Sequence, residues 1–216
     1  MATTQSKLKR VKYVKPSKSY TSYTSSLSNT SKCVVVGDNN VGKTTLLTLY
    51  TTGKLLLEDQ IPRVFDNYSQ QVGDYALELW DTYKPEEYDR YRQYCYPNTD
   101  IILVCFSVAR EASFYNVKDF WTDEIQTYRP ETPWLLVGTK TDLRDAPGAS
   151  EVKHFGRANV FIMPEEGRSA AKQLGASGYV ECSSKEDLNV KEVFDEVRST
   201  RSTLVALALC SMWVLE

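Results

Sequence analysis

The chain has 216 residues, of which 42% are hydrophobic, and its 26 lysines and arginines nearly balance its 28 aspartates and glutamates. This length suits one domain of about 100–200 residues with short extensions. The composition excludes a collagen, a coiled coil and a chain disordered throughout. No apolar run approaches the ~20 residues that a membrane-spanning helix needs.

The first 31 residues are rich in Ser, Thr, Lys and Tyr and show no sustained apolar period. Residues 1–32 hold seven cationic side chains and no acidic one; removing these seven leaves 19 cationic against 28 acidic residues, a net charge of −9. We expect residues 1–31 to form a disordered basic arm, because they cannot bury enough apolar surface to offset the ordering entropy. Three roles stay open: a solvated tail, an arm attracted to anionic lipid, or a transit peptide, which the excess of lysine over arginine disfavours.

The cysteines indicate a reducing compartment. They are odd in number, widely spaced and form no CxxC pair, so we expect free thiols, with Cys33 and Cys105 buried inside apolar runs. The N-terminus also lacks the apolar core of a secretory signal. We therefore expect a cytoplasmic protein, with peripheral contact at the plasma membrane as an open alternative.

From residue 32 the chain alternates short apolar runs with helical stretches, which is typical of an α/β domain with a mainly parallel sheet. Gly73-Asp74 separates two strand-like runs and predicts a hairpin with one antiparallel edge strand. Ligands of such folds bind at loops beyond the carboxyl ends of the strands. The predicted strands are 33–37, 75–81, 101–107, 133–139 and 179–184.

Two helices carry clear boundary signals. One is predicted to begin at Pro164 and to end at Gly175, with proline just inside its start and glycine past its end. The last helix is predicted to follow a capping Asn189, with Glu192 three residues later. Its apolar stripe is Val190, Val193, Phe194 and Val197.

Residues 37–44, Gly-Asp-Asn-Asn-Val-Gly-Lys-Thr, satisfy the phosphate-loop pattern G-x-x-x-x-G-K-[ST] between a predicted strand and a helical stretch. Glycines permit a tight loop whose amides point at phosphate oxygens at a helix N-terminus. Lys43 would reach the β- and γ-phosphates, and the Thr44 hydroxyl would bind Mg²⁺. The predicted nucleotide-binding residues here are Asn40, Val41, Gly42, Lys43, Thr44 and Thr45.

Other segments follow in order, and with the phosphate loop they make residues 32–200 resemble the Ras-like small GTPases and, among them, the Rho group. Those segments are Val64, Phe65, Asp66, Asn67 and Tyr68, similar to the Rho effector region; Trp80-Asp81-Thr82, similar to the start of the second switch; Thr139-Lys140-Thr141-Asp142, similar to the guanine-reading motif; Glu181-Cys182-Ser183-Ser184, similar to the second base loop; and 146–163, similar to the Rho insertion.

The resemblance implies a Ras-like P-loop α/β domain with a mixed, mostly parallel six-stranded sheet flanked by helices. It also implies GTP or GDP as ligand, Mg²⁺ held by Thr44 and Asp81, protein effectors at residues 64–68, regulators, and signalling to the actin cytoskeleton. Asp142 can accept from both the ring N–H and the exocyclic amine of guanine, which adenine cannot match. The nucleotide-binding residues implied beyond the phosphate loop are Asp81, Thr139, Lys140, Asp142, Ser183, Ser184 and Lys185.

The chain departs from the family pattern at positions that serve hydrolysis. Asn39 replaces a glycine beside the γ-phosphate, where a side chain crowds the attacking water and a partner's arginine finger. Pro85 replaces the water-orienting glutamine, and Lys84 replaces a neighbouring glycine. Arg63 replaces a threonine of the first switch, and a guanidinium cannot ligate a cation.

These changes together predict very slow hydrolysis, so that the protein stays GTP-bound and the chain has no confident catalytic residue. Two alternatives stay open. One is a conventional GTP-hydrolysing switch in which Glu86 or Glu87 positions water. The other is a nucleotide-free scaffold, favoured if Arg63 and Asn39 exclude GTP.

Residues 201–216 are predicted to form an apolar C-terminal tail that caps the core or touches a membrane, with Cys210 as a candidate for acylation. A prenylation box is absent, because Trp213 occupies the fourth position from the end. The acidic body argues against nucleic-acid binding, and a monomer is expected. Five tyrosines around the second switch predict either an effector patch or local packing: Tyr83, Tyr88, Tyr91, Tyr94 and Tyr96.

Overall fold

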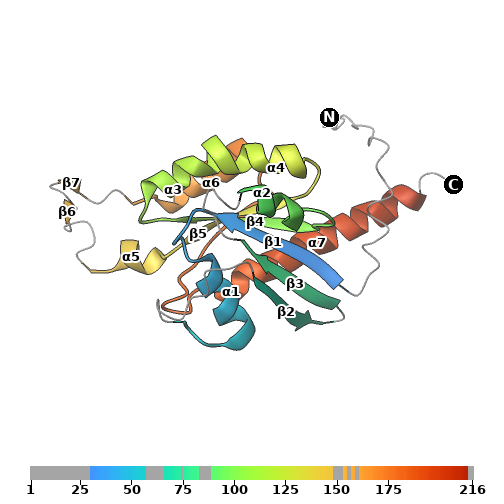
Figure 1. Cartoon of the computed structure of the whole chain (residues 1–216), viewed down its shortest axis with the longest axis horizontal. Coiled ribbons are helices and arrows are strands. Elements are labelled where there is room, and N and C mark those ends of the chain that lie inside the picture. The colour runs from blue at the N-terminus through green and yellow to red at the C-terminus, as the bar shows by residue number, and fades with distance from the viewer. Residues whose placement is uncertain are drawn as a thin grey trace, which may run out of the picture.

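The computed structural model describes residues 30–56, 66–73, 75–82, 89–147, 153–154, 157–158 and 161–213. A six-stranded sheet in the order β2-β3-β1-β4-β5-β8 lies between two layers of helices (Figure 1). All neighbouring strands are parallel except the β2–β3 pair. The strands are β1 (Thr30–Gly37), β2 (Asp66–Val72), β3 (Tyr75–Asp81), β4 (Ile101–Ser107), β5 (Trp134–Thr139) and β8 (Gly178–Glu181).

The helices connect these strands and supply both apolar layers. Among the described residues they are α1 (Lys43–Thr52), α2 (Asp89–Arg92), the 3₁₀ turn η4 (Gln93–Cys95), α3 (Glu111–Asn116), the π-helical turn η5 (Val117–Trp121), α4 (Thr122–Tyr128), α5 (Thr141–Asp145), α6 (Pro164–Leu174) and α7 (Val190–Trp213). A short separate hairpin pairs β6 (Lys153–His154) with β7 (Arg157–Ala158), inside the predicted insertion.

The core has two halves because the central strands are buried on both faces. Cys33 and Val35 of β1 point to the side covered by α1 and α7, while Val34 and Val36 point to the side covered by η5, α4 and α6. This alternation follows from the two-residue period of a strand. Near-continuous apolar runs are what a parallel sheet covered on both faces requires, so the predicted fold class is confirmed.

The predicted strand boundaries hold for the central elements and shift at the ends. Strands β3 and β4 have the predicted bounds, and the antiparallel β2–β3 hairpin forms with Gly73 at φ +59°, whereas Asp74 lies outside the described residues. Strand β1 begins at Thr30, inside the predicted arm, and Ser31 is fully buried. Strand β8 ends at Glu181, three residues before the predicted end.

The predicted starts of α6 and α7 are confirmed, but the predicted capping residue of α7 is not. Helix α6 begins at Pro164 and is closed by the left-handed Gly175, as predicted. The predicted cap at Asn189 is wrong: its backbone is left-handed, with φ +56°, and its side-chain amide donates to the carbonyl of Glu181 at 3.1 Å. Asn189 therefore ties the start of α7 to the end of β8.

Helix α7 runs unbroken from Val190 to Trp213 and so crosses residue 201, where the apolar tail was predicted to begin. Its first half packs against the sheet through Val193, Phe194 and Val197. Its far end projects past the sheet (Figure 1). Within the described part of the chain, no helix is long and apolar enough to span a membrane.

Candidate functional site

The phosphate loop lies between β1 and α1 at the carboxyl edge of the sheet (Figure 1). Gly37 has φ +140°, and a Cβ there would lie 2.2 Å from the carbonyl oxygen of Cys105, so only glycine fits under the loop. Gly42 has φ +103°, and Asn40 has φ +60°, a left-handed conformation that asparagine tolerates better than most residues. The sequence thus supplies suitable residues where the loop turns.

Three consecutive carbonyls of this loop accept hydrogen bonds from side chains outside it. Arg110 Nη1 donates to the carbonyl of Asn39 at 2.9 Å, and Lys140 Nζ donates to that of Asn40 at 2.6 Å. The Thr139 hydroxyl donates to the carbonyl of Val41.

A trans peptide unit directs its N–H opposite to its C=O, and the peptide bonds of the described residues are trans. Fixing these three carbonyls therefore turns the amides of Asn40, Val41 and Gly42 the other way. Three successive amides left in this way are what an anion-binding nest requires, and we refer to them below as the nest.

Lys43 is the cation of the loop and is 6% exposed. Its Nζ donates to the carbonyls of Gly37 at 2.7 Å and Asp38 at 2.9 Å. Burial lowers the pKa of Lys43 to about 8, although nearby Asp81 acts in the opposite direction. The ammonium group is thus held beside the nest in a poorly solvated position, where an anion stabilises its charged form.

Thr44 and Asp81, the two predicted metal ligands, lie side by side. The Thr44 hydroxyl donates to Oδ2 of Asp81, whose side chain is buried at the end of β3. Next to it, the Thr82 hydroxyl donates to the carbonyl of Val35 at 2.7 Å and ties this end of β3 to β1. A hydroxyl and a carboxylate are ligands that Mg²⁺ accepts together with waters and phosphate oxygens, so the pair fits this ion.

The predicted base-reading residues also come together. Oδ1 of Asp142 accepts from the Ser183 hydroxyl at 2.7 Å, and Nζ of Lys185 lies 3.9 Å from Oδ2. Asp142 is 9% exposed, so its carboxylate is held in a fixed orientation at the start of α5. Ser184 lies in the same loop, and Thr45 lies in the first turn of α1.

Arg144 links the start of the loop that holds Ser183 to the segment before α6. It donates to the Glu181 carboxylate at 2.6 Å and to the carbonyl of Ile162 at 2.9 Å. Its ion pair with Glu181 is largely buried.

The effector and switch predictions fall only partly on described residues. Asp66, Asn67 and Tyr68 form the first half of β2, an edge strand; Asn67 is exposed, whereas Tyr68 packs partly against the core. The predicted positions outside the described residues are Arg63, Val64, Phe65, Tyr83, Lys84, Pro85, Glu86, Glu87 and Tyr88.

Three of the five tyrosines around the second switch lie in the described part of the chain, and they differ in exposure. Tyr91 and Tyr94 are 59% and 70% exposed on α2 and η4. Tyr96 is buried, and its hydroxyl donates to Glu124.

Sequence reasoning missed the environment of Asp38, the second residue of the loop. Its carboxylate is 3% exposed and accepts from Arg110 at 2.8 Å, Asn116 Nδ2 at 2.7 Å and Trp121 Nε1 at 3.1 Å. All three donors come from α3, η5 or the residue before α3. The one local signal was the carboxylate itself, because an acidic side chain in a phosphate-binding loop needs donors of its own.

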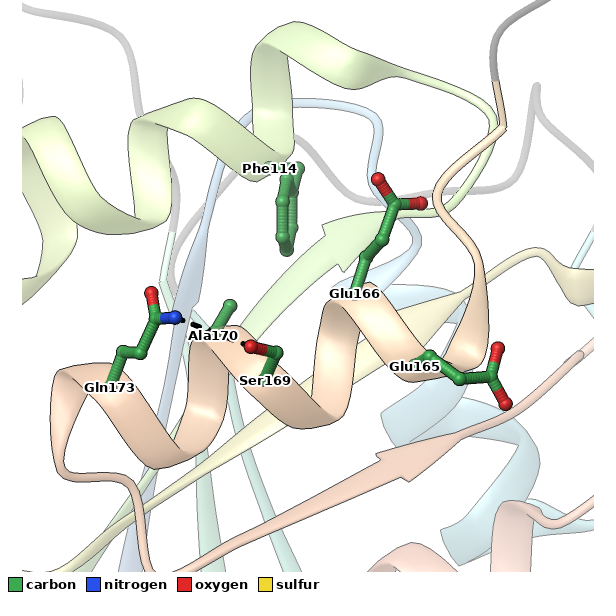
Figure 2. A pocket seen from close by; sticks show the side chains of 6 residues that line it. All are labelled: Phe114, Glu165, Glu166, Ser169, Ala170 and Gln173. Carbon is green, nitrogen blue, oxygen red and sulfur yellow. Dashed lines mark hydrogen bonds between the residues drawn. The ribbon is translucent and has the colours of Figure 1, made fainter.

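A separate hollow of about 380 Å³ lies between α3 and α6 (Figure 2). None of its lining residues belongs to the predicted nucleotide set. They are Phe114, Glu165, Glu166, Ser169, Ala170 and Gln173.

The family comparison agrees with this geometry. The model of the Ras family matches residues 32–202, which is most of the chain and includes the phosphate loop and both base loops. The match also covers the sheet from residue 32 of β1 onward and the flanking helices, with α7 included as far as residue 202. The chain therefore belongs to the Ras family of small GTPases and is a guanine-nucleotide-binding signalling protein.

Proposed function

We propose that this protein is a Rho-like member of its family that holds GTP together with Mg²⁺, hydrolyses it very slowly and signals to effector proteins while GTP is bound. The observation that carries the proposal is the phosphate loop. Three of its consecutive carbonyls are held by side chains outside the loop, which leaves the amides of the same peptide units for an anion, while residue 39 at the same site is an asparagine. The loop is thus built for binding, and its side chain at position 39 opposes hydrolysis.

Binding of GTP divides among three groups of residues. The amides of Asn40, Val41 and Gly42 would hold phosphate oxygens, and the buried Lys43 would neutralise their charge. The carboxylate of Asp142, oriented by Ser183, would accept from the guanine N–H groups. Thr44 and Asp81 would hold Mg²⁺, which when bound neutralises phosphate charge.

Slow hydrolysis follows from what this chain lacks at the reacting end. Asn39 carries a side chain where the family has glycine, and Pro85 replaces the glutamine that orients water. A proline side chain neither donates nor accepts a hydrogen bond. The obstructed arginine finger of a partner is itself a loss of about 10³–10⁵ in rate.

Effector contact is proposed at residues 64–68, of which residues 66–68 belong to the edge strand β2. The Rho assignment, and with it a role in the actin cytoskeleton, is supported by the resemblance of this segment and by the insertion at 146–163. A cytoplasmic monomer with peripheral contact at the plasma membrane, through the basic arm or the apolar end of α7, belongs to the same proposal.

The test is to count the nucleotide in purified protein and to follow it during incubation. We expect close to one GTP per chain, still GTP after hours with Mg²⁺. Accumulated GDP would instead support a conventional hydrolysing switch, and nucleotide-free protein would support a scaffold. Chelation by EDTA should speed nucleotide release, and unchanged release would contradict the Mg²⁺ site.

A double variant addresses the cause of slow hydrolysis. We expect Asn39→Gly with Pro85→Gln to raise the single-turnover hydrolysis rate at least tenfold. The matched control is Asn98→Gly, which changes another asparagine, at φ +58° on an exposed turn, and should leave the rate unchanged. Equal rates in all three proteins would contradict the assignment of Asn39 and Pro85.

A further inference from the structure

Arg110 joins the start of α3 to a loop 71 residues earlier in the chain. Its Nη1 donates to the carbonyl of Asn39 at 2.9 Å, and its Nη2 donates to Oδ2 of Asp38 at 2.8 Å. A guanidinium is planar and holds its donors at fixed spacing, so two such bonds fix the group in one orientation. Lysine in this place would satisfy only one of the two acceptors well.

The Asp38 carboxylate is a rigid partner for this contact. Besides Arg110 it accepts from Asn116 at 2.7 Å and from the indole of Trp121 at 3.1 Å, and it is almost completely buried. Trp121, the last residue of η5, is itself fully buried in the core. Arg110 therefore connects the carbonyl of Asn39 to a support that the core of the domain holds in place.

Arg110 binds the one of the three loop carbonyls that the guanine-reading motif does not bind. Thr139 and Lys140 hold the carbonyls of Val41 and Asn40, and the carbonyl of Asn39 accepts from Arg110. Because Asn39 and Asn40 share a trans peptide unit, a fixed Asn39 carbonyl fixes the direction of the Asn40 amide. That amide is the first of the three that form the nest.

We propose that Arg110 is a positioning residue for the nucleotide: it holds the Asn39–Asn40 peptide unit so that the Asn40 amide faces the phosphates. The proposal rests on the proposed binding of GTP. In this role Arg110 acts through the backbone, because its guanidinium donates to the carbonyl of Asn39 and to the carboxylate of Asp38. Its side chain is 45% exposed, so its charge is partly screened by solvent.

The experiment compares dissociation of fluorescent GDP and of a fluorescent non-hydrolysable GTP analogue from the full chain. Arg110→Ala should release both nucleotides about tenfold faster and to the same extent, since the Asn40 amide serves either one. Arg110→Lys should lie between Arg110→Ala and the wild type. The matched control is Arg168→Ala, which removes an exposed ion pair with Glu165 on α6 and should change neither rate.

An amide spectrum separates positioning from a loss of general stability. In ¹⁵N-labelled protein, binding of GDP should shift the Asn40 amide proton less in Arg110→Ala than in the wild type, whereas the Gly42 shift, which depends on Thr139, should be retained. If Arg110→Ala fails to fold, Arg110→Lys carries the same comparison, with a smaller change expected at Asn40 alone.

Three results would contradict the positioning role of Arg110, and a fourth would contradict the proposed binding of GTP. Faster release of the GTP analogue alone would show contact with the terminal phosphate and overturn the positioning role. Unchanged release of both nucleotides, or equal loss of the Asn40 and Gly42 shifts, would overturn it as well. A wild-type protein that binds neither nucleotide would instead overturn the proposed function, on which this inference depends.

Discussion

At the scale of single residues, Lys43 shows how burial prepares a group for its ligand. The ammonium group lies almost out of contact with water, and burial lowers its pKa to about 8 from an ordinary value of 10.5. Its ammonium group donates to the backbone carbonyls of Gly37 and Asp38, and a neutral carbonyl stabilises the charge less than a phosphate does. Nucleotide binding should therefore raise this pKa again.

This shift predicts a pH-dependent affinity. Below pH 8 Lys43 is already charged in the free protein, so its titration leaves GDP affinity unchanged. Above pH 8 the free protein loses this proton while the complex retains it, so binding takes up a proton and affinity falls by up to tenfold per pH unit. Titration calorimetry in buffers of different ionisation enthalpy measures that proton directly.

The control for this prediction is Lys43→Gln, which retains every other titrating group and the same ligand. It should bind GDP more weakly at pH 7 and lose affinity less steeply between pH 8 and 9.5. Parallel slopes in the two proteins would show that another group is responsible.

The residues of the site divide by whether a local pattern encodes them. Lys43, Thr44 and Asp142 were predicted because the loop and the base motif each place their residues within a few positions of one another. Arg110 was not, because its partner lies 71 positions away and nothing in the intervening sequence marks the pair. Asn189 was assigned a capping role from its residue type, and its left-handed backbone directs the amide to Glu181 instead.

At the scale of elements, a buried ion pair attaches the second-switch region to α4. Both Nε and Nη2 of Arg92 donate to Glu124, at 2.6 Å and 2.5 Å, and the Tyr96 hydroxyl donates to the same carboxylate. The guanidinium also lies 4.9 Å from the ring centroid of Trp121. The Arg92 and Glu124 side chains are 1% and 11% exposed, so neither charge is well hydrated.

Removing one partner of this pair should be costly. We expect Glu124→Gln to lower the free energy of unfolding by about 3–5 kcal/mol, because it leaves the Arg92 charge buried without its counter-ion. Urea unfolding of the GDP-bound protein measures the loss. The double variant Arg92→Met with Glu124→Leu should recover more than half of it, since both charges are then removed.

An exposed pair provides the comparison. Glu165→Gln removes the acidic partner of Arg168 on the surface of α6 and should leave the unfolding midpoint unchanged. If both Glu124→Gln and Glu165→Gln left it unchanged, the Arg92–Glu124 pair would not hold α2 and η4 to the body.

Element prediction worked best where burial is two-sided. Strands such as β4 are uninterrupted apolar runs, and their bounds were predicted to the residue. The start of β1 was missed because Thr30 and Ser31 are polar, and their place in the sheet comes from pairing with Ala76 and Leu77 of β3. The spacing of apolar residues did not predict the π-helical turn at η5.

At the scale of the whole molecule, the charge is distributed unequally between arm and body. Six cations lie in residues 1–31, and residues 204–213 at the end of α7 are mostly apolar. Each cation near an anionic surface contributes about 1 kcal/mol, and an apolar segment adds a second attachment. This pairing is the basis for the proposed membrane contact.

We expect the full chain to bind vesicles that contain anionic lipid and to bind neutral vesicles at least tenfold more weakly. Replacing the six cations of residues 1–31 by glutamine should abolish the difference between the two lipids, and raised salt should do the same. The matched control replaces six serines and threonines of the arm by glutamine. Co-sedimentation measures each case, and equal binding of the two arm variants would return the arm to the role of a solvated tail.

The positions at which the first strand begins and the last helix ends matter for attaching labels to the protein. Strand β1 starts, and α7 stops, at the pole of the domain opposite the phosphate loop (Figure 1). A tag, a fluorophore or a chip linker attached at Thr30 or at Trp213 therefore leaves the nucleotide loops facing away from the attachment. Molecules immobilised at Thr30 or Trp213 should exchange nucleotide as freely as molecules in solution, and labels at these two positions should lie at the same pole of the domain.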